Sequence, residues 1–73
     1  MRRFDRVEIK PMRPPASPDF SLERGVIHEM VKGSPYYAPY YGVSLDGRTY
    51  LVWFLENQLR KLSLLEIIAE AAI

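Results

Sequence analysis

Cysteine is absent from this 73-residue chain, and histidine occurs only once. Disulfide bonds and cysteine-based zinc sites are therefore excluded, and a single histidine does not hold a metal ion alone. We expect neither a metal nor any other cofactor. The length predicts one small domain over residues 1–73, near the lower limit of independent stability. Without disulfides or metals, self-association or a partner chain is the natural source of extra stability.

Long hydrophobic runs and an excess of charge are also missing. The longest stretch without a charged residue covers residues 33–45 and is interrupted by proline and glycine, whereas a membrane span needs about 20 apolar residues. The first residues lack the apolar core of a signal peptide. The hydrophobic fraction of 48% is that of a folded domain, and the net charge of +1 argues against a strongly electrostatic DNA-coating protein. We expect a cytoplasmic protein that does not contact a membrane.

Motifs with a specific chemistry are missing as well. No Gly-x-Ser-x-Gly elbow, phosphate-binding loop or dinucleotide fingerprint occurs. His28 stands next to Glu29, but we expect it on a solvated surface, where it lacks the pocket that acid–base catalysis requires. We therefore expect that the protein is not an enzyme.

The N-terminal part predicts a strand and a connector. Residues 3–10 alternate in part, which predicts a half-exposed, edge-like strand with Val7 and Ile9 on one face. Several prolines follow within residues 11–18. Because proline neither continues a strand nor allows a helix before it, this segment predicts a stiff, extended connector.

Residues 21–32 have their apolar side chains on one half of a helical wheel. Ser21 is a suitable N-cap, and Gly33 stands in the usual stop position. The segment therefore predicts an amphipathic helix, although Gly25 inside it costs about 1 kcal/mol relative to alanine. A strand over residues 26–31 is the alternative.

Asp46-Gly47 is the clearest local signal, because a type I′ turn requires positive φ at both central residues. A two-residue loop predicts three cross-strand pairs: Leu45 with Arg48, Val43 with Tyr50, and Tyr41 with Val52. One face of this hairpin is predicted to join the core. The other face is polar near the turn and apolar at its far end, where Tyr40 is predicted opposite Trp53. That second face must be covered or must serve as a binding surface.

Two interpretations remain open for the residues after the hairpin. In one, a third strand over residues 58–62 precedes a helix that begins at a capping box on Ser63. In the other, one continuous helix covers residues 56–72. The capping box favours the three-stranded version, which places Arg60 across from Trp53 in a cation–π contact. The elements together predict an α+β domain: an N-terminal strand, an amphipathic helix, an antiparallel meander of two or three strands, and a C-terminal apolar helix.

The C-terminal helix is apolar on nearly all sides, since Glu66 and Glu70 form its one polar stripe. Such a helix requires burial on more than one side, and a domain of this size offers it little core. We therefore expect a protein-interaction module, either a homo-oligomer or a small accessory subunit of a larger assembly. The expected contact residues are Leu64, Leu65, Ile68 and Ala72.

Aromatic and basic residues support a second hypothesis, a small nucleic-acid-binding protein. Single-stranded nucleic acid is bound by aromatic rings that stack on bases and by cations that contact phosphates. The candidate stacking residues are Tyr36, Tyr37, Tyr40 and Trp53, and the candidate cations are Arg2, Arg3, Arg6, Arg13 and Arg60. The alternatives are that the tyrosines close the small core and that the charges protect an edge strand from aggregation. Few basic residues stand close to the tyrosine run, which favours protein contact.

Overall fold

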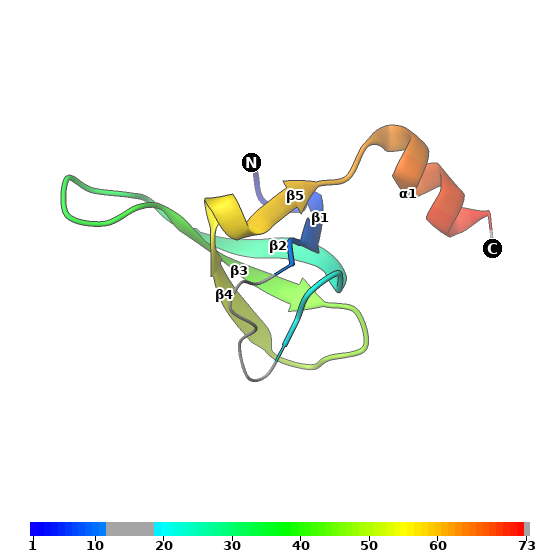
Figure 1. Cartoon of the computed structure of the whole chain (residues 1–73), viewed down its shortest axis with the longest axis horizontal. Helices are drawn as coiled ribbons and strands as arrows, with labels where there is room; N and C mark the ends of the chain where they lie inside the picture. The colour runs from blue at the N-terminus through cyan, green and yellow to red at the C-terminus, as the bar shows by residue number, and fades with distance from the viewer. Residues whose placement is uncertain (12–18, 73) are drawn as a thin grey trace.

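The computed structural model describes residues 1–11 and 19–72, and it shows a five-stranded antiparallel sheet followed by one α-helix (Figure 1). The elements in chain order are β1 (Arg6–Ile9), β2 (Arg24–Val31), β3 (Tyr40–Leu45), β4 (Leu51–Leu55), the 3-10 turn η1 (Glu56–Gln58), β5 (Leu59–Lys61) and α1 (Leu64–Ala71). The α+β class is confirmed, but the sheet has five strands instead of two or three. Most of the predicted Pro-rich connector, residues 12–18, lies outside the described residues.

The sheet has the strand order β4-β3-β2-β1-β5, and every neighbouring pair is antiparallel. β4 and β5 are the two edge strands of this order, yet only the three residues of η1 separate them in the chain. The sheet must therefore curl, so that its two edges approach each other at one end. Its inner face encloses the core, and its outer face is left for other contacts. The β2–β3 loop and α1 lie at opposite ends of the long axis of the molecule (Figure 1).

The core is built from alternate strand residues that point to the inner face of the sheet. Val7 and Ile9 of β1 are fully buried, as the alternation predicts. Phe20, from the loop before β2, meets Phe54 of β4 edge to face, with ring centroids 6.0 Å apart. The buried hydrophobic residues of the described chain are Val7, Ile9, Phe20, Ile27, Tyr41, Val43, Leu45, Phe54, Leu59 and Leu62. None of them belongs to α1, so the sheet and its loops form the core without the helix.

The predicted helix over residues 21–32 is wrong, because Arg24–Val31 form strand β2. The pairing register with β3 shifts between Ile27 and Glu29, which marks a β-bulge. The bulge interrupts the two-residue alternation and leaves an apolar pattern that resembles a helical period. Gly25 serves close strand packing, since a Cβ atom on it would lie 2.4 Å from a backbone oxygen of β3.

Strand β1 is not an edge strand, contrary to the prediction. It lies between β2 and β5 and pairs with both of them. Its half-exposed character is confirmed, because Arg6 and Glu8 on the outer face are only partly buried. Alternation reports how deeply each face of a strand is buried, but it carries no information about hydrogen bonding along the two edges of the strand.

The β3–β4 hairpin is confirmed, but its register differs by two residues from the prediction. Val43 lies opposite Val52 instead of Tyr50, and β4 begins only at Leu51. Gly47 has the expected positive φ of +80°, but Asp46 is not among the residues with positive φ, so the predicted type I′ turn with a two-residue loop is wrong. A shift of two residues leaves each side chain on its predicted face, because successive side chains alternate. The predicted core face is therefore largely correct, although Tyr50 is exposed.

The interpretation with a further strand and a capped helix is confirmed, since β5 covers Leu59–Lys61 and Ser63 caps α1. The partner of β5 is β1, however, and not β4. Arg60 therefore lies opposite Glu8, and its predicted cation–π contact with Trp53 is wrong. The short connection through η1 carries the chain across the end of the sheet to its other edge instead of turning it into a hairpin.

Candidate interaction surfaces

Helix α1 meets the sheet with its polar stripe instead of its apolar residues. The Ser63 hydroxyl accepts a hydrogen bond from the Glu66 N–H at 3.2 Å, and the Glu66 carboxylate accepts one from the Ser63 N–H at 3.0 Å. This capping box starts the helix. Glu66 and Glu70 are the only partly buried residues of α1, and its other residues are exposed. The arrangement is the reverse of an ordinary amphipathic helix, which buries its apolar stripe.

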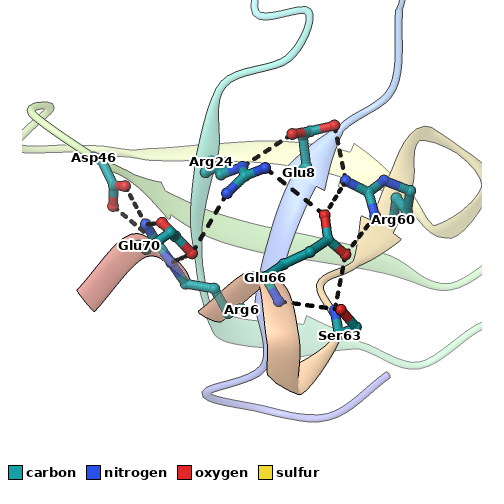
Figure 2. A network of polar contacts seen from close by, with 8 residues as sticks. All are labelled: Arg6, Glu8, Arg24, Asp46, Arg60, Ser63, Glu66 and Glu70. Carbon is teal, nitrogen blue, oxygen red and sulfur yellow. Dashed lines mark hydrogen bonds and ion pairs between the residues drawn. The ribbon is translucent and has the colours of Figure 1, made fainter. Parts of the chain in front are cut away.

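Glu66 is held by two arginines on the outer face of the sheet (Figure 2). Its carboxylate oxygens accept hydrogen bonds from the Arg60 guanidinium at 2.9 and 2.8 Å, and the carboxylate lies 3.7 Å from Arg24. Glu8 of β1 joins the same cluster, 2.9 Å from Arg24 and 3.1 Å from Arg60. Two carboxylates and two guanidinium groups therefore balance each other beneath the helix, across β1, β2 and β5.

Glu70 makes the second attachment, one turn further along α1 (Figure 2). Two nitrogens of the Arg6 guanidinium donate to its carboxylate at 3.3 and 2.6 Å, and the carboxylate lies 3.6 Å from Arg24. Arg6 also donates to both carboxylate oxygens of Asp46 in the β3–β4 turn. The Arg6 side chain thus connects β1, the helix and the turn.

The hydrogen bonds from arginine to Glu66 and Glu8 shift the ionisation of these two carboxylates toward the charged form. The Arg60 guanidinium, followed by the backbone N–H of Ser63, lowers the pKa of Glu66 from 4.5 to about 2. The hydrogen bond from Arg24, followed by that from Arg60, lowers the pKa of Glu8. The attachment of α1 therefore depends on carboxylates that are ionised at neutral pH.

We expect acid to release α1 from the sheet. The pKa of Glu66 is lower in the folded protein than its ordinary value, so the stability that its charge contributes is fully present above about pH 4.5 and is lost as the pH falls toward 2. The pKa of Glu8 is shifted in the same direction and adds to the same transition. An NMR titration of the backbone measures the effect: the α1 resonances move to random-coil positions below pH 4.5, and those of β2 and β3 serve as the control. A helix that persists to pH 2 would contradict this view of its attachment.

The outward side of α1 is an apolar strip, which we define as Leu64, Leu65, Ile68 and Ala72. These are the contact residues predicted from the sequence, and all four are exposed, with Leu64 at 72%, Leu65 at 79% and Ile68 at 54%. At about 100° per residue, Ile68 stands opposite the midpoint of the two glutamates. The strip carries no charge and faces away from the sheet.

A second apolar area, which we call the aromatic face, consists of Tyr40, Trp53 and Leu55 on the outer side of β3 and β4. Tyr40 lies opposite Leu55, and Trp53 lies opposite Gly42, so the predicted Tyr40–Trp53 pair is wrong by two residues. The two rings still meet diagonally, edge to face, with centroids 5.6 Å apart. A Cβ atom on Gly42 would lie 3.1–3.2 Å from the indole, so the ring rests on the glycine backbone. Trp53 nevertheless remains 48% exposed.

The arginines proposed as phosphate contacts are not gathered into one basic patch among the described residues. Arg6 and Arg60 are paired with carboxylates beneath α1. Arg3 donates to the backbone oxygen of His28, whose side chain is exposed as expected. Arg2 is exposed near the N-terminus, and Arg13 lies outside the described residues.

The tyrosine run serves two different purposes in the structure. Tyr36 and Tyr37 stand in the β2–β3 loop and are 94% and 53% exposed, so they do not close the core. Tyr37 packs near Tyr40, with centroids 6.2 Å apart, which extends the aromatic face toward the loop. Tyr41 is buried, and this burial raises its pKa. A cavity of about 300 Å³ lies at the base of the loop and is lined by Met30, Val31, Lys32, Pro39 and Tyr41.

Sequence reasoning did not find the ion-pair network that attaches α1. A helix over residues 21–32 gives Arg24 no place beside β1 and β5, and the charged residues of β1 were interpreted as phosphate contacts or as protection of an edge strand. A signal was present in Glu66 and Glu70, which are four residues apart and form the one polar stripe of an otherwise apolar helix. The signal could not be interpreted without knowing that arginines from three strands lie beneath that stripe.

Residues 1–11 and 19–72 contain neither a helix that is long and apolar enough to cross a membrane nor a group of three or more histidine and carboxylate side chains suited to a metal ion. The features that stand out among these residues are the charged attachment of α1, the apolar strip and the aromatic face. Comparison of the chain with protein-family models, curated proteins and solved structures found no match.

Proposed function

We propose that this protein is a non-enzymatic interaction module that binds another protein chain through the apolar strip of α1. The observation that carries the proposal is the orientation of the helix. Its two glutamates bind the sheet, and Leu64, Leu65 and Ile68 are directed into solvent. Exposed apolar side chains gathered on one element are typical of a surface that another molecule covers.

Covering the strip would provide a substantial driving force for association. Complete burial of one leucine or isoleucine side chain contributes about 1.5–3 kcal/mol, and the strip presents three of them. The helix is also held in place before any partner arrives, by its capping box and by the ion pairs of Glu66 and Glu70. Binding therefore costs less conformational entropy than it would for a free helix.

Nucleic-acid binding is supported less well by the same contacts. Arg6 and Arg60 would have to leave carboxylate partners before they could contact phosphates. The exposed tyrosines of the β2–β3 loop would supply stacking groups, but the arginines beneath α1 are not available beside them. Protein contact also accounts for the exposed strip, which nucleic-acid binding leaves unexplained.

Site-specific photocrosslinking tests the proposal. A photoreactive phenylalanine derivative replaces Leu65, which is 79% exposed on the strip, and in a control it replaces Leu22, which is 62% exposed between β1 and β2. In cells that produce the protein, we expect a covalent adduct with one defined protein chain from position 65 and none from position 22. Adducts from neither position, or the same adducts from both, would overturn the proposal.

A further inference from the structure

The aromatic face and the attachment site of α1 belong to the same side of the sheet. Pairing and alternation place the following residues on this outer face: Arg60, Glu8, Arg24, Val26, Ser44, Leu51 and Trp53. Through its ion pairs, α1 covers the half of this face that lies over β1, β2 and β5. The half over β3 and β4 keeps its tryptophan exposed. One face of the protein therefore carries a covered charged half and an open aromatic half.

The aromatic face is organised in advance to receive apolar side chains. Gly42 supports the indole of Trp53 from below, and Tyr40 contacts its edge, so the ring is held in one orientation. Leu55 beside them is 43% exposed, and the three residues carry no charge. A fixed, half-exposed aromatic ring is the kind of residue that contributes most to protein interfaces.

The apolar strip is too small to form a stable symmetric contact with another strip alone. With eight residues, α1 is about 12 Å long and, with its side chains, about 10 Å wide. Two such strips would bury on the order of a few hundred Å², whereas a specific interface buries about 800 Å² on each partner. If each copy contributes both its strip and its aromatic face, the exposed surface of Trp53 and Leu55 adds to the buried area on both sides.

The positions of the two surfaces fit such a reciprocal contact. Arg6 links Glu70 of α1 to Asp46. Asp46 lies four residues along the chain from Gly42, on which the Trp53 ring rests. Four strand residues span about 13 Å, which is close to the length of the helix. Because the strip and the aromatic face both point outward from the same side of the sheet, a two-fold axis between them brings the strip of each copy toward the aromatic face of the other.

We propose that the partner is a second copy of this chain, and that the apolar strip of each copy packs on the aromatic face of the other. This inference rests on the interaction function proposed above and names both the partner and the receiving surface. Both surfaces are uncharged, so their contact opposes no like charges. The glutamates of α1 keep their arginine partners within their own chain, and both open surfaces become covered.

Solution mass measured by light scattering over a range of concentrations is the first part of the test. We expect the full chain to form a species of twice its 8.5 kDa. Ile68→Asp weakens this dimer by about 100-fold or more, because each dimer contains the substitution twice. The matched control is Leu22→Asp, which adds the same charge at an exposed leucine with φ 66°, where aspartate is tolerated. The control dimerises like the unsubstituted chain.

Trp53, the single tryptophan, reports directly on the receiving surface. We expect its fluorescence maximum to move to longer wavelength when the protein is diluted, because dissociation exposes the indole to water. Ile68→Asp shows the longer wavelength at every concentration, whereas Leu22→Asp behaves like the unsubstituted chain. An emission maximum that stays at the same wavelength when the dimer dissociates would overturn the assignment of the aromatic face.

Mixing two variants distinguishes the reciprocal contact from direct pairing of helices. Trp53→Lys damages the receiving surface, and Ile68→Asp damages the strip, so each variant alone is expected to be monomeric. Their mixture contains one unaltered contact and one that pairs the introduced aspartate with the introduced lysine. We therefore expect mixed dimers at concentrations where neither variant dimerises. Leu55→Lys replaces Trp53→Lys if circular dichroism shows that the latter is unfolded.

The remaining outcomes separate the two proposals. A monomer at all concentrations, with position 65 crosslinked to a different protein, overturns the second-copy inference and leaves the interaction function standing. A dimer that Trp53→Lys and Leu55→Lys do not weaken shows that the helices pair directly, which also overturns the inference alone. A monomer without any adduct from position 65 overturns both proposals.

Discussion

Replacing Glu66 and Glu70 together by glutamine is expected to detach α1 and melt it, while the five strands stay folded. Within its own chain the helix buries none of its apolar residues, so at concentrations where the chain is monomeric its attachment depends on the ion pairs with Arg6, Arg24 and Arg60. Once detached, an eight-residue helix is too short to persist in water. Circular dichroism and the α1 backbone resonances measure the loss, and we expect most of the helical signal to disappear at neutral pH.

The control for this variant is Glu29→Gln, which removes one negative charge from an exposed position of β2. It should leave α1 in place, because Glu29 takes no part in the network beneath the helix. The backbone resonances of β2 and β3 follow the strands in both variants. A double variant that keeps its helix would show that contacts other than the ion pairs hold α1, and the explanation given for its exposed leucines would then be wrong.

Ile27→Ala is expected to remove a large part of the total stability. Ile27 is fully buried in β2, at the centre of the sheet order. Truncation of a buried isoleucine to alanine costs about 2–5 kcal/mol, and a domain of this length has a total stability of only about 4–11 kcal/mol. For a small domain each kcal/mol corresponds to about 4–8 °C. We therefore expect the melting temperature to fall by at least about 8 °C, with unfolding at ambient temperature as the extreme result.

Val26→Ala is the matched control, because Val26 is the neighbour of Ile27 on the outer face of the same strand and is only partly buried. We expect Val26→Ala to lose clearly less stability, because folding removes less apolar surface from water at that position. Thermal unfolding of both variants, followed by circular dichroism, makes the comparison. Equal melting temperatures would mean that the inner face of β2 is not the core of this domain.

Part of the fold follows from features that lie close together in the chain. Alternation identified Val7 and Ile9 as buried, and Asp46-Gly47 identified the hairpin and both of its faces. The Ser63 capping box identified the start of α1. In each case, residues within a few positions of one another make the decisive interaction, so the pattern of side chains is sufficient.

The sequence predicted the candidate surfaces about as well as it predicted these local features of the fold. The periodicity of α1 identified Leu64, Leu65, Ile68 and Ala72 as residues that the domain has no core to bury, and the structure leaves them exposed. Hairpin alternation placed Trp53 on the outer face, although with the wrong partner across the strand pair. The predicted role of the arginines depended on their neighbours in space, which the sequence does not show.

Local pattern alone determined which segments alternate, where the hairpin turns, where the last helix begins and which of its residues are apolar. Tertiary structure decided that Arg24–Val31 is a strand, because Gly25 and the bulge are understood only against β3. It also decided that β5 pairs with β1, and that α1 turns its glutamates inward toward arginines from three different strands. The physical reason is the same for each. The free energy of these arrangements comes from strand pairing and charge contacts between residues far apart in the chain, and the local periodicity of the sequence contains no information about such contacts.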